Sequence, residues 1–490
     1  MLDEPLIFER GSRGRVGWPV PPAPDGGVPA LPPELRREDD LAGLPEVSEL
    51  ETLRHFLRLS QWNYSAATTL YPLGSCTMKY NPVVNEEVAR MPGFAGLHPL
   101  VPDGLAQGAL ELLAALESAL AAVSGLDAVC LQPAAGAHGE LLGMLLVRAY
   151  HVDRGTPRRR VLIPSSAHGT NPASATLCGY EVREVPADAR GLLPAAAVAK
   201  AMDESVAALM ITNPNTLGLF ETEMEAITAA VHARGGLVYM DGANLNAIMG
   251  VAKPGDMGVD VMQFNLHKTF STPHGGGGPG AGPVAVRSPL AEYLPVPRLT
   301  RRGQTLGWSD DAPKSVGRLR SFYGNFGILV RAYAYISRLG GPGLAEATRL
   351  AVLNANYLRA LLRGTYHLPY DTPSLHECVF SDRHLQEYDV HTLDVAKRLL
   401  DYGFYAPTIY FPLVVKGALM IEPTETETRE TLDEFADAML RIAEEARTEP
   451  ATVRDAPHKT RVARLDETRA ARRPILRWRP PDREKTGESA

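Results

Sequence analysis

The sequence has little cysteine, and its four cysteines are far apart. Cys76, Cys130, Cys178 and Cys378 form no C-x-x-C pair. This spacing predicts neither a disulfide scaffold nor a zinc site, and we expect no bound metal. Sparse, unpaired cysteine fits the reducing environment of the cytoplasm.

The sequence also lacks an excess of basic residues and any long apolar run. Its 50 Lys and Arg residues against 57 Asp and Glu residues give a net charge of -7. Nucleic acid is therefore not expected as a partner, because that role usually needs a basic surface. No run of about 18 apolar residues is present, so no membrane span is expected. The acidic, proline-interrupted start does not resemble a secretory signal, and we expect a cytoplasmic protein.

At 490 residues the chain is long enough for at least two domains. We predict a proline-rich arm and helical segment over residues 1–100, a large domain over 101–335, a small domain over 336–447 and a charged tail over 448–490. The arm contains a helix at 48–59. Its proline-rich part, residues 1–45, is either a disordered tail or an extended arm on a partner subunit. Phe8 and Trp18 keep the second reading open, since disordered tails are usually poor in aromatic residues.

Apolar strands alternate with helical stretches through the large domain. Such alternation predicts an α/β fold with a mostly parallel, seven-stranded sheet covered by helices on both faces. We expect the strands at residues 128–131, 160–163, 181–185, 206–212, 237–241, 261–265 and 282–286. We expect the helices at residues 104–124, 139–152, 194–202 and 222–233.

The small domain reads as α+β. A helix at 343–362 precedes short strands at 376–381 and 418–421, with further helices at 392–402 and 427–446. A glycine run at 275–280, before the last strand of the large sheet, offers little side-chain bulk beside the preceding loop.

Two strands of the large domain deliver an acid and an amine at their C-terminal ends. Asp241 ends one strand and Lys268 follows the next, 268 − 241 = 27 residues later. Ligands bind at this edge of open α/β sheets, and a lysine with an aspartate partner is what pyridoxal phosphate requires. We therefore predict that Lys268 binds this cofactor as an imine.

Asp241 would lie against the pyridine nitrogen of the cofactor. At ~4 Å and an effective dielectric constant near 20, the attraction is about 4 kcal/mol. That energy equals roughly three pKa units, so the ring nitrogen would stay protonated and the ring would act as an electron sink.

The cofactor's phosphate has candidate contacts in two places. Gly136 and Ala137 lie in a small-residue turn between the first strand and a helix, where backbone N–H groups bind anions. Asn265 and His267, on either side of Leu266, are able to donate hydrogen bonds near Lys268.

The ring has three further candidate contacts. His168 follows the second strand and could stack on the ring, which is worth on the order of 1 kcal/mol. Thr216 and Asn244 follow two other strands at the same edge and could hydrogen-bond the phenolic oxygen. The residue that binds a substrate carboxylate is left open among several arginines.

Five longer motifs resemble those of one family. They are Tyr-Pro-Leu-Gly-Ser-Cys-Thr-Met-Lys at 71–79, Ser-Ala-His-Gly-Thr-Asn-Pro-Ala-Ser at 166–174, Met-Asp-Gly-Ala-Asn at 240–244, Leu-His-Lys-Thr-Phe at 266–270 and Met-Ile-Glu-Pro-Thr-Glu at 420–425. With them the chain resembles the pyridoxal-phosphate proteins of fold type I, and more closely the P-protein of the glycine cleavage system, glycine dehydrogenase (decarboxylating).

The resemblance implies more than the residues alone do. In that family the lysine of the Leu-His-Lys-Thr-Phe motif binds the cofactor, which here implies Lys268. The chain is similar to the lysine-bearing half, subunit 2, which pairs with a homologous subunit 1 in an α2β2 assembly. The implied reaction decarboxylates glycine and transfers its aminomethyl group to the lipoyl arm of H-protein, with Lys268 and His168 as proton handlers.

Two alternatives remain open at this stage. Another fold type I enzyme acting on a small amino acid, such as a cysteine desulfurase, would share a histidine after the second strand and a His-Lys pair, but it needs a mobile cysteine loop. A structural half-subunit or a cofactor-binding regulator would not be an enzyme. Lys268 argues against the structural half, and no DNA-binding module is visible for a regulator.

Overall fold

The structure is a computed structural model that describes residues 4–18, 21, 31–36, 44–275 and 280–478. By contacts the chain divides into two compact units. One is formed by Met1–Ser65 with Val462–Ala490, and the other by Ala66–Arg461. Most of the proline-rich stretch at 18–24 and residues 276–279 of the glycine run lie outside the described residues.

The first unit is built on helix α1 (Glu49–Ser60), close to the predicted 48–59. Ser48 and Glu51 form a capping box at its N-terminus, in which the Glu51 carboxylate accepts from the Ser48 N–H at 2.8 Å. The carboxylate of Glu4 is buried and lies 2.8 Å from His55 Nδ1 on this helix, which fixes the N-terminal segment to α1. Helix α15 (Glu467–Arg472) belongs to the same unit.

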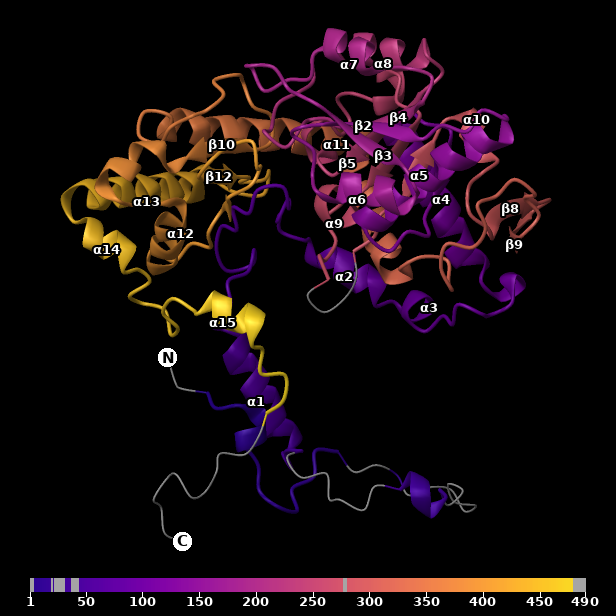
Figure 1. Ribbon diagram of the computed structural model, residues 1–490. Coiled ribbons are helices and arrows are strands. Elements are labelled where there is room, and N and C mark those ends of the chain that lie inside the picture. Colours follow the sequence, from indigo (N-terminus) through magenta and orange to yellow (C-terminus); the bar gives the residue numbers. More distant parts are fainter. Residues whose placement is uncertain (1–3, 19–20, 22–30, 37–43, 276–279, 479–490) are drawn as a thin grey trace. The chain divides into compact units, whose positions relative to one another are not determined.

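The second unit contains the predicted seven-stranded sheet, in the order β1-β7-β6-β5-β4-β2-β3 (Figure 1). Its strands β6, β5, β4, β2 and β3 run parallel, and β7 pairs antiparallel with both β6 and β1. The fold prediction is thus confirmed. The strands are β1 (Ala128–Cys130), β2 (Arg160–Pro164), β3 (Glu181–Val185), β4 (Val206–Thr212), β5 (Leu237–Gly242), β6 (Val261–Phe264) and β7 (Val284–Val286).

Each central strand is apolar on both faces because helices cover both. Leu209 and Ile211 of β4 join one hydrophobic core, whereas Ala208 and Met210 join the other. Successive side chains of a strand point to opposite faces, and both faces are buried here, so the sequence of each strand is a continuous apolar run. The covering helices are α4 (Gln107–Ser124), α5 (Gly136–Asp153), α6 (Thr170–Leu177), α7 (Ala195–Ala201) and α8 (Met224–His232), and shorter helices are α2 (Val83–Ala89), α3 (Pro92–Ala95), α9 (Leu266–Thr269) and α10 (Ser288–Ala291).

Three features of this unit differ from the sequence prediction. Helix α5 begins at Gly136, three residues before the predicted start. Helix α6 forms where no helix was predicted, and Pro172 in its first turn costs it no hydrogen bond. Strands β8 (Arg298–Arg302) and β9 (Thr305–Ser309) form an unpredicted hairpin.

The C-terminal part of this unit has its own three-stranded antiparallel sheet and core. The sheet order is β10-β12-β11, from strands β10 (Cys378–Ser381), β11 (Thr408–Ile409) and β12 (Ala418–Ile421). Helices α12 (Thr392–Asp401), α13 (Arg429–Thr448) and α14 (Pro450–Arg454) pack beside it. Val453 of α14, which lies within the tail predicted from residue 448, is fully buried in this core.

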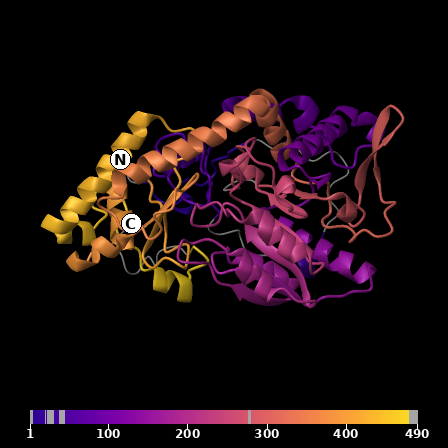
Figure 2. The same cartoon turned by 90° about the horizontal axis from the view of Figure 1, so that it is seen from above.

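One long helix connects the two sheets. Helix α11 (Phe326–Leu362) includes the predicted helix at 343–362 and is kinked at Gly340, whose φ is 62°. Figure 2 shows this orange helix extending from the large sheet toward the C-terminal elements. Within the described ranges, no helix is both long and apolar enough to cross a membrane. The domain boundaries at residues 100, 335 and 447 stay predictions.

Candidate active site

A cavity of about 260 Å³ lies at the C-terminal edge of the large sheet. Strand β5 brings Asp241 to it, and β6 leads into α9, which carries Lys268. All nine residues predicted from the sequence line this cavity, although their roles are not thereby tested. They are Gly136, Ala137, His168, Thr216, Asp241, Asn244, Asn265, His267 and Lys268.

The carboxylate of Asp241 is held rigidly at the cavity wall. It accepts hydrogen bonds from the Ala243 N–H at 2.9 Å, from Asn171 Nδ2 at 3.0 Å and from Gln263 Nε2 at 2.5 Å. Only 2% of the residue is exposed. These three donors fix one orientation of the carboxylate, as a partner for a ring nitrogen needs.

A second buried acid, Glu140, lines the same cavity and was missed by the sequence analysis. It accepts from Thr170 Oγ1 at 2.8 Å and from Asn171 Nδ2 at 3.0 Å, so Asn171 bridges Glu140 and Asp241. Burial, and next to it the charge of Asp241, raise the pKa of Glu140 to about 7. A helix predicted to begin at Gly136 would have pointed to Glu140, because residues four apart lie on the same face of a helix.

His168 lies at the mouth of the cavity and is partly exposed. Its Nδ1 is 2.8 Å from Thr170 Oγ1, and its ring contacts Phe411 edge-on at 5.6 Å. Burial lowers the pKa of His168. The charge of Asp241 opposes this decrease, and the charge of Lys268 adds to it. The imidazole is therefore neutral near pH 7 and able to accept a proton.

Thr216 and Asn244 use their polar groups within the protein. The Thr216 hydroxyl donates to the Ser166 carbonyl, and Asn244 Nδ2 donates to the Pro214 carbonyl at 3.0 Å. Asn244 Oδ1 is buried and has no hydrogen-bond partner among the described residues. Their contact with a phenolic oxygen stays a prediction.

The predicted phosphate contacts meet at the first turn of α5. A Cβ atom at Gly136 would lie 2.7 Å from Asn265 Nδ2, so only glycine allows this approach. Asn265 Nδ2 and His267 Nε2 are 3.2 Å apart. Burial is the main cause that lowers the pKa of His267 to about 3, so this ring is neutral.

The loop at 71–82 is fastened beside the cavity by a buried lysine. Lys79 Nζ donates to Glu425 Oε1 at 2.7 Å, to Asn246 Oδ1 at 2.8 Å and to the Thr269 carbonyl at 2.8 Å. Burial alone would lower the pKa of Lys79, but Glu425 and Tyr335 together reverse this shift and raise the pKa. Because Thr269 follows Lys268, this ammonium group joins the loop, the lysine turn and the C-terminal sheet.

We expect Lys79→Met to destabilise the protein by about 3–5 kcal/mol, because it leaves the Glu425 carboxylate buried without its cation. Urea unfolding followed by circular dichroism measures the loss. Lys200→Met, on the exposed end of α7, is the control and should change stability by less than about 0.5 kcal/mol. Equal unfolding midpoints for the two variants would contradict the role given to Lys79.

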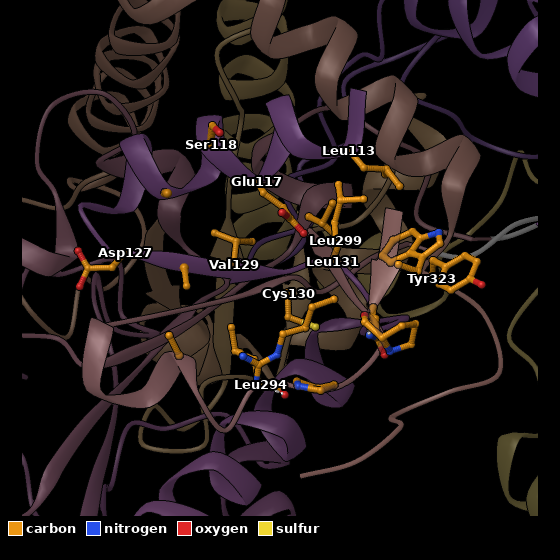
Figure 3. A pocket seen from close by; sticks show the side chains of 18 residues that line it. Leu113, Glu117, Ser118, Asp127, Val129, Cys130, Leu131, Leu294, Leu299 and Tyr323 are labelled. Carbon is orange, nitrogen blue, oxygen red and sulfur yellow. Dashed lines mark hydrogen bonds between the residues drawn. The ribbon is translucent and has the colours of Figure 1, made fainter. Parts of the chain in front are cut away.

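A second cavity, of about 550 Å³, lies between α4, β1 and the β8–β9 hairpin (Figure 3). Glu117, Cys130 and Leu299 are among its lining residues. Burial raises the pKa of Glu117 to about 8. None of the nine predicted residues lines this larger cavity, so its size does not make it the site of the lysine chemistry.

No cysteine thiol is activated in the structure. Burial raises the pKa of Cys130 and Cys378 to about 12 and that of Cys178 to about 11. Burial also raises the pKa of Cys76, although Lys268 opposes the shift. A nucleophilic cysteine needs a lowered pKa, so these four environments do not favour desulfurase chemistry.

Comparison with known proteins decides the family. The profile of the glycine cleavage system P-protein matches residues 28–314, and that of the glycine dehydrogenase C-terminal domain matches residues 347–462. The chain belongs to the glycine cleavage system P-protein family. The P-protein relatives include the probable glycine dehydrogenase (decarboxylating) subunit 2 of Exiguobacterium sibiricum, 54% identical over 98% of both chains. The protein of the same description from Caldanaerobacter subterraneus subsp. tengcongensis is 52% identical over 96% of this chain and 98% of its own.

Solved structures agree with the fold expected of a P-protein. A glycine decarboxylase (P-protein) of the glycine cleavage system, in inhibitor-bound form, superposes with a TM-score of 0.70 at 22% identity, over 84% of this chain and 93% of that one. A glutamate decarboxylase from Lactobacillus brevis gives 0.65 at 13% identity, over 84% and 96%. The P-protein chain described here is a fold type I protein, and its cofactor is pyridoxal phosphate.

The residues of this P-protein fit that cofactor. Glycine at 136 lets the Asn265 side chain approach the first turn of α5, and Asn244 Oδ1 and Asn265 Oδ1 are buried without a protein partner in the described part of the chain. Asp241 and the first turn of α5 both line the cavity. Lys268 is the amine among the lining residues.

Proposed function

We infer that the chain is the lysine-bearing subunit of a glycine dehydrogenase (decarboxylating). The reaction breaks the bond between the two carbons of glycine and releases CO₂. The electron pair left on the remaining carbon forms a bond to one lipoyl sulfur while the disulfide breaks, and the second sulfur leaves as a thiolate that takes a proton. The observation that carries this function is the placement of Lys268 and Asp241 on one cavity of a chain 54% identical to a subunit 2.

The bound pyridoxal phosphate supplies the electron sink that makes loss of CO₂ feasible. The chain's own residues position it and move protons. Lys268 would hold it covalently, Asp241 would face its ring nitrogen, and the first turn of α5 with Asn265 and His267 would bind its phosphate. His168, neutral at the mouth of the cavity, would accept or return a proton near the substrate.

The partners follow from the same proposal. Relatives described as subunit 2 imply a partner subunit 1 for this chain. We propose that the two form an α2β2 assembly in the cytoplasm, and that lipoylated H-protein delivers its disulfide to the cavity. Neither nucleic acid nor a membrane is expected to take part.

Exchange of labelled bicarbonate into the carboxyl group of glycine tests the reaction. We expect exchange when the purified chain is combined with subunit 1, lipoylated H-protein and pyridoxal phosphate, because decarboxylation is then reversible. H-protein without its lipoyl group is the control and should support little exchange. Absence of exchange with every component present would refute the function, and release of sulfide from cysteine would support the desulfurase alternative.

A further inference from the structure

Three side chains that the reaction above does not use are buried together at one end of the C-terminal sheet. His376, Glu377 and Glu422 are each 0% exposed. His376 Nε2 lies 3.9 Å from Glu377 Oε2 and 3.9 Å from Glu422 Oε1. The charge of Lys268 acts on all three groups. A buried histidine with two carboxyl groups on which the charge of the reactive lysine acts therefore needs an explanation.

The register of the C-terminal sheet forces the two acids together. Strands β10 and β12 are antiparallel, and Cys378 pairs with Ile421. Glu377 precedes the first of these residues and Glu422 follows the second, so they stand opposite each other at the end of the ladder. Like charges opposite each other destabilise a sheet, and two buried carboxyl groups in such a position do not both ionise readily.

Hydrogen bonds from the 71–82 loop distinguish the two acids. Glu422 accepts from the Thr77 N–H at 2.9 Å and from Thr77 Oγ1 at 2.5 Å, so both of its oxygens act as acceptors, as in a carboxylate. Glu377 accepts from the Ser75 N–H at 2.8 Å through Oε2. Its Oε1 is buried and, in the described part of the chain, has no partner. If one acid of the pair is protonated, the proton is therefore expected on Oε1 of Glu377.

The loop that makes these bonds also lines the active-site cavity. Ser75 is one of the cavity's lining residues. Ser75 and Thr77 have φ values of 63° and 47°, a left-handed conformation that costs of order 1–3 kcal/mol for such residues. The two carboxyl groups hold this conformation through the backbone N–H groups, and so connect the pair to the cavity.

His376 adds a neutral acceptor between the acids. Neither of its ring nitrogens has a hydrogen-bond partner among the residues the structure describes. Burial is the main cause that lowers the pKa of His376 to about 3. Burial also raises the pKa of Glu377, and that of Glu422 to about 7. Other titratable groups whose charges act on the carboxyl pair or on which it acts are Cys76, Cys378 and Glu425.

We propose that Glu377 and Glu422 form a carboxyl pair that holds one proton and exchanges it with the amine of Lys268. This rests on the proposed function, because Lys268 becomes a free amine only when the amine of the substrate takes its place. The pair's O–H bond then breaks and an N–H bond forms on Lys268. The proton returns to the pair when Lys268 binds the cofactor again, so the exchange is balanced and involves no oxidation.

The experiment follows the visible absorption of the cofactor bound to Lys268 as the pH is raised from about 5 to 9 in the assembled enzyme. We expect a wild-type titration with a step that belongs to the carboxyl pair. Glu377→Gln and Glu422→Gln should each lose this step, because glutamine keeps the shape of glutamate but does not titrate. Bicarbonate exchange should fall about 100-fold, the usual scale for a lost proton-transfer group.

Two further variants serve as a second test and as a control. Thr77→Val leaves both acids in place but removes a hydroxyl that stabilises the Glu422 carboxylate, so the step should move to higher pH. It carries the test if a glutamine variant does not fold. Glu117→Gln changes another acid of raised pKa, in the cavity of Figure 3, and should leave the titration unchanged.

Three results would overturn the proposal. The first is a wild-type titration in both glutamine variants, and the second is a titration step in Thr77→Val at the same pH as in the wild type. The third is a stoichiometric metal ion in the purified enzyme that is lost in Glu377→Gln, which would make the cluster a metal site instead. Failure of the proposed function looks different. The titration step would then respond to the variants as expected, while the wild-type enzyme would show no bicarbonate exchange.

Discussion

Lys268→Ala is expected to fold and to assemble with its partner but to hold no cofactor by a covalent bond. Alanine removes the amine, and the buried strand and short helix that present it do not depend on that side chain. Borohydride should therefore trap no cofactor on the protein, and bicarbonate exchange should fall by at least about 10³-fold, within the range known for lost acid-base groups. Mass spectrometry after borohydride reduction measures the first effect directly.

The matched control for Lys268→Ala is Lys253→Ala, a lysine in the loop after β5 that does not line the cavity. It should trap cofactor as the wild type does. A borohydride-stable cofactor adduct that survives in Lys268→Ala would show that another lysine carries the cofactor, and the assignment of the site would fail.

Asp241→Asn is expected to retain the cofactor and lose most turnover. Asparagine keeps the size of the side chain but removes the charge that holds the ring nitrogen protonated. The attraction of about 4 kcal/mol estimated for this pair corresponds to a decrease in turnover of roughly 10³-fold. Cofactor content measured by absorption, together with the rate of bicarbonate exchange, separates loss of binding from loss of turnover.

Asp260→Asn provides the comparison at the opposite end of the same sheet. Asp260 accepts from the Val238 N–H at 2.7 Å and contacts His232, so its change should lower stability without slowing the folded enzyme. Unchanged turnover in Asp241→Asn, or equal losses of turnover in the two variants, would remove the ring-nitrogen role from Asp241.

The large sheet and its rim could be predicted because their signals are local. Each central strand is a short apolar run, and parallel strands present their C-terminal ends at one edge. Asp241 and Lys268 therefore met in one cavity as expected, with His168 and Thr216 from neighbouring strands. Helix α6 was missed for a local reason too, since Gly, Asn and Pro at 169–172 read as a loop although proline suits a first turn.

The carboxyl groups around the site could not be predicted in this way. Glu377 and Glu422 meet only through the register of β10 with β12, which no pattern in either strand specifies. The 71–82 loop includes the family motif at 71–79, but its partners Glu377, Glu422 and Glu425 lie 302 to 346 residues away in the chain. Glu140 lies four residues after the predicted Gly136 and needed only the correct start of α5.

The buried ammonium group of Lys79 also sets the order in which the site is made during synthesis. Its partners are Asn246, Thr269 and Glu425, so the turn that carries Lys268 gains its last support only after residue 425 has left the ribosome. A nascent chain that ends before this point has the lysine but lacks this support. Capture of the reactive aldehyde of pyridoxal phosphate in the finished geometry is thereby delayed until Glu425 has been added to the chain.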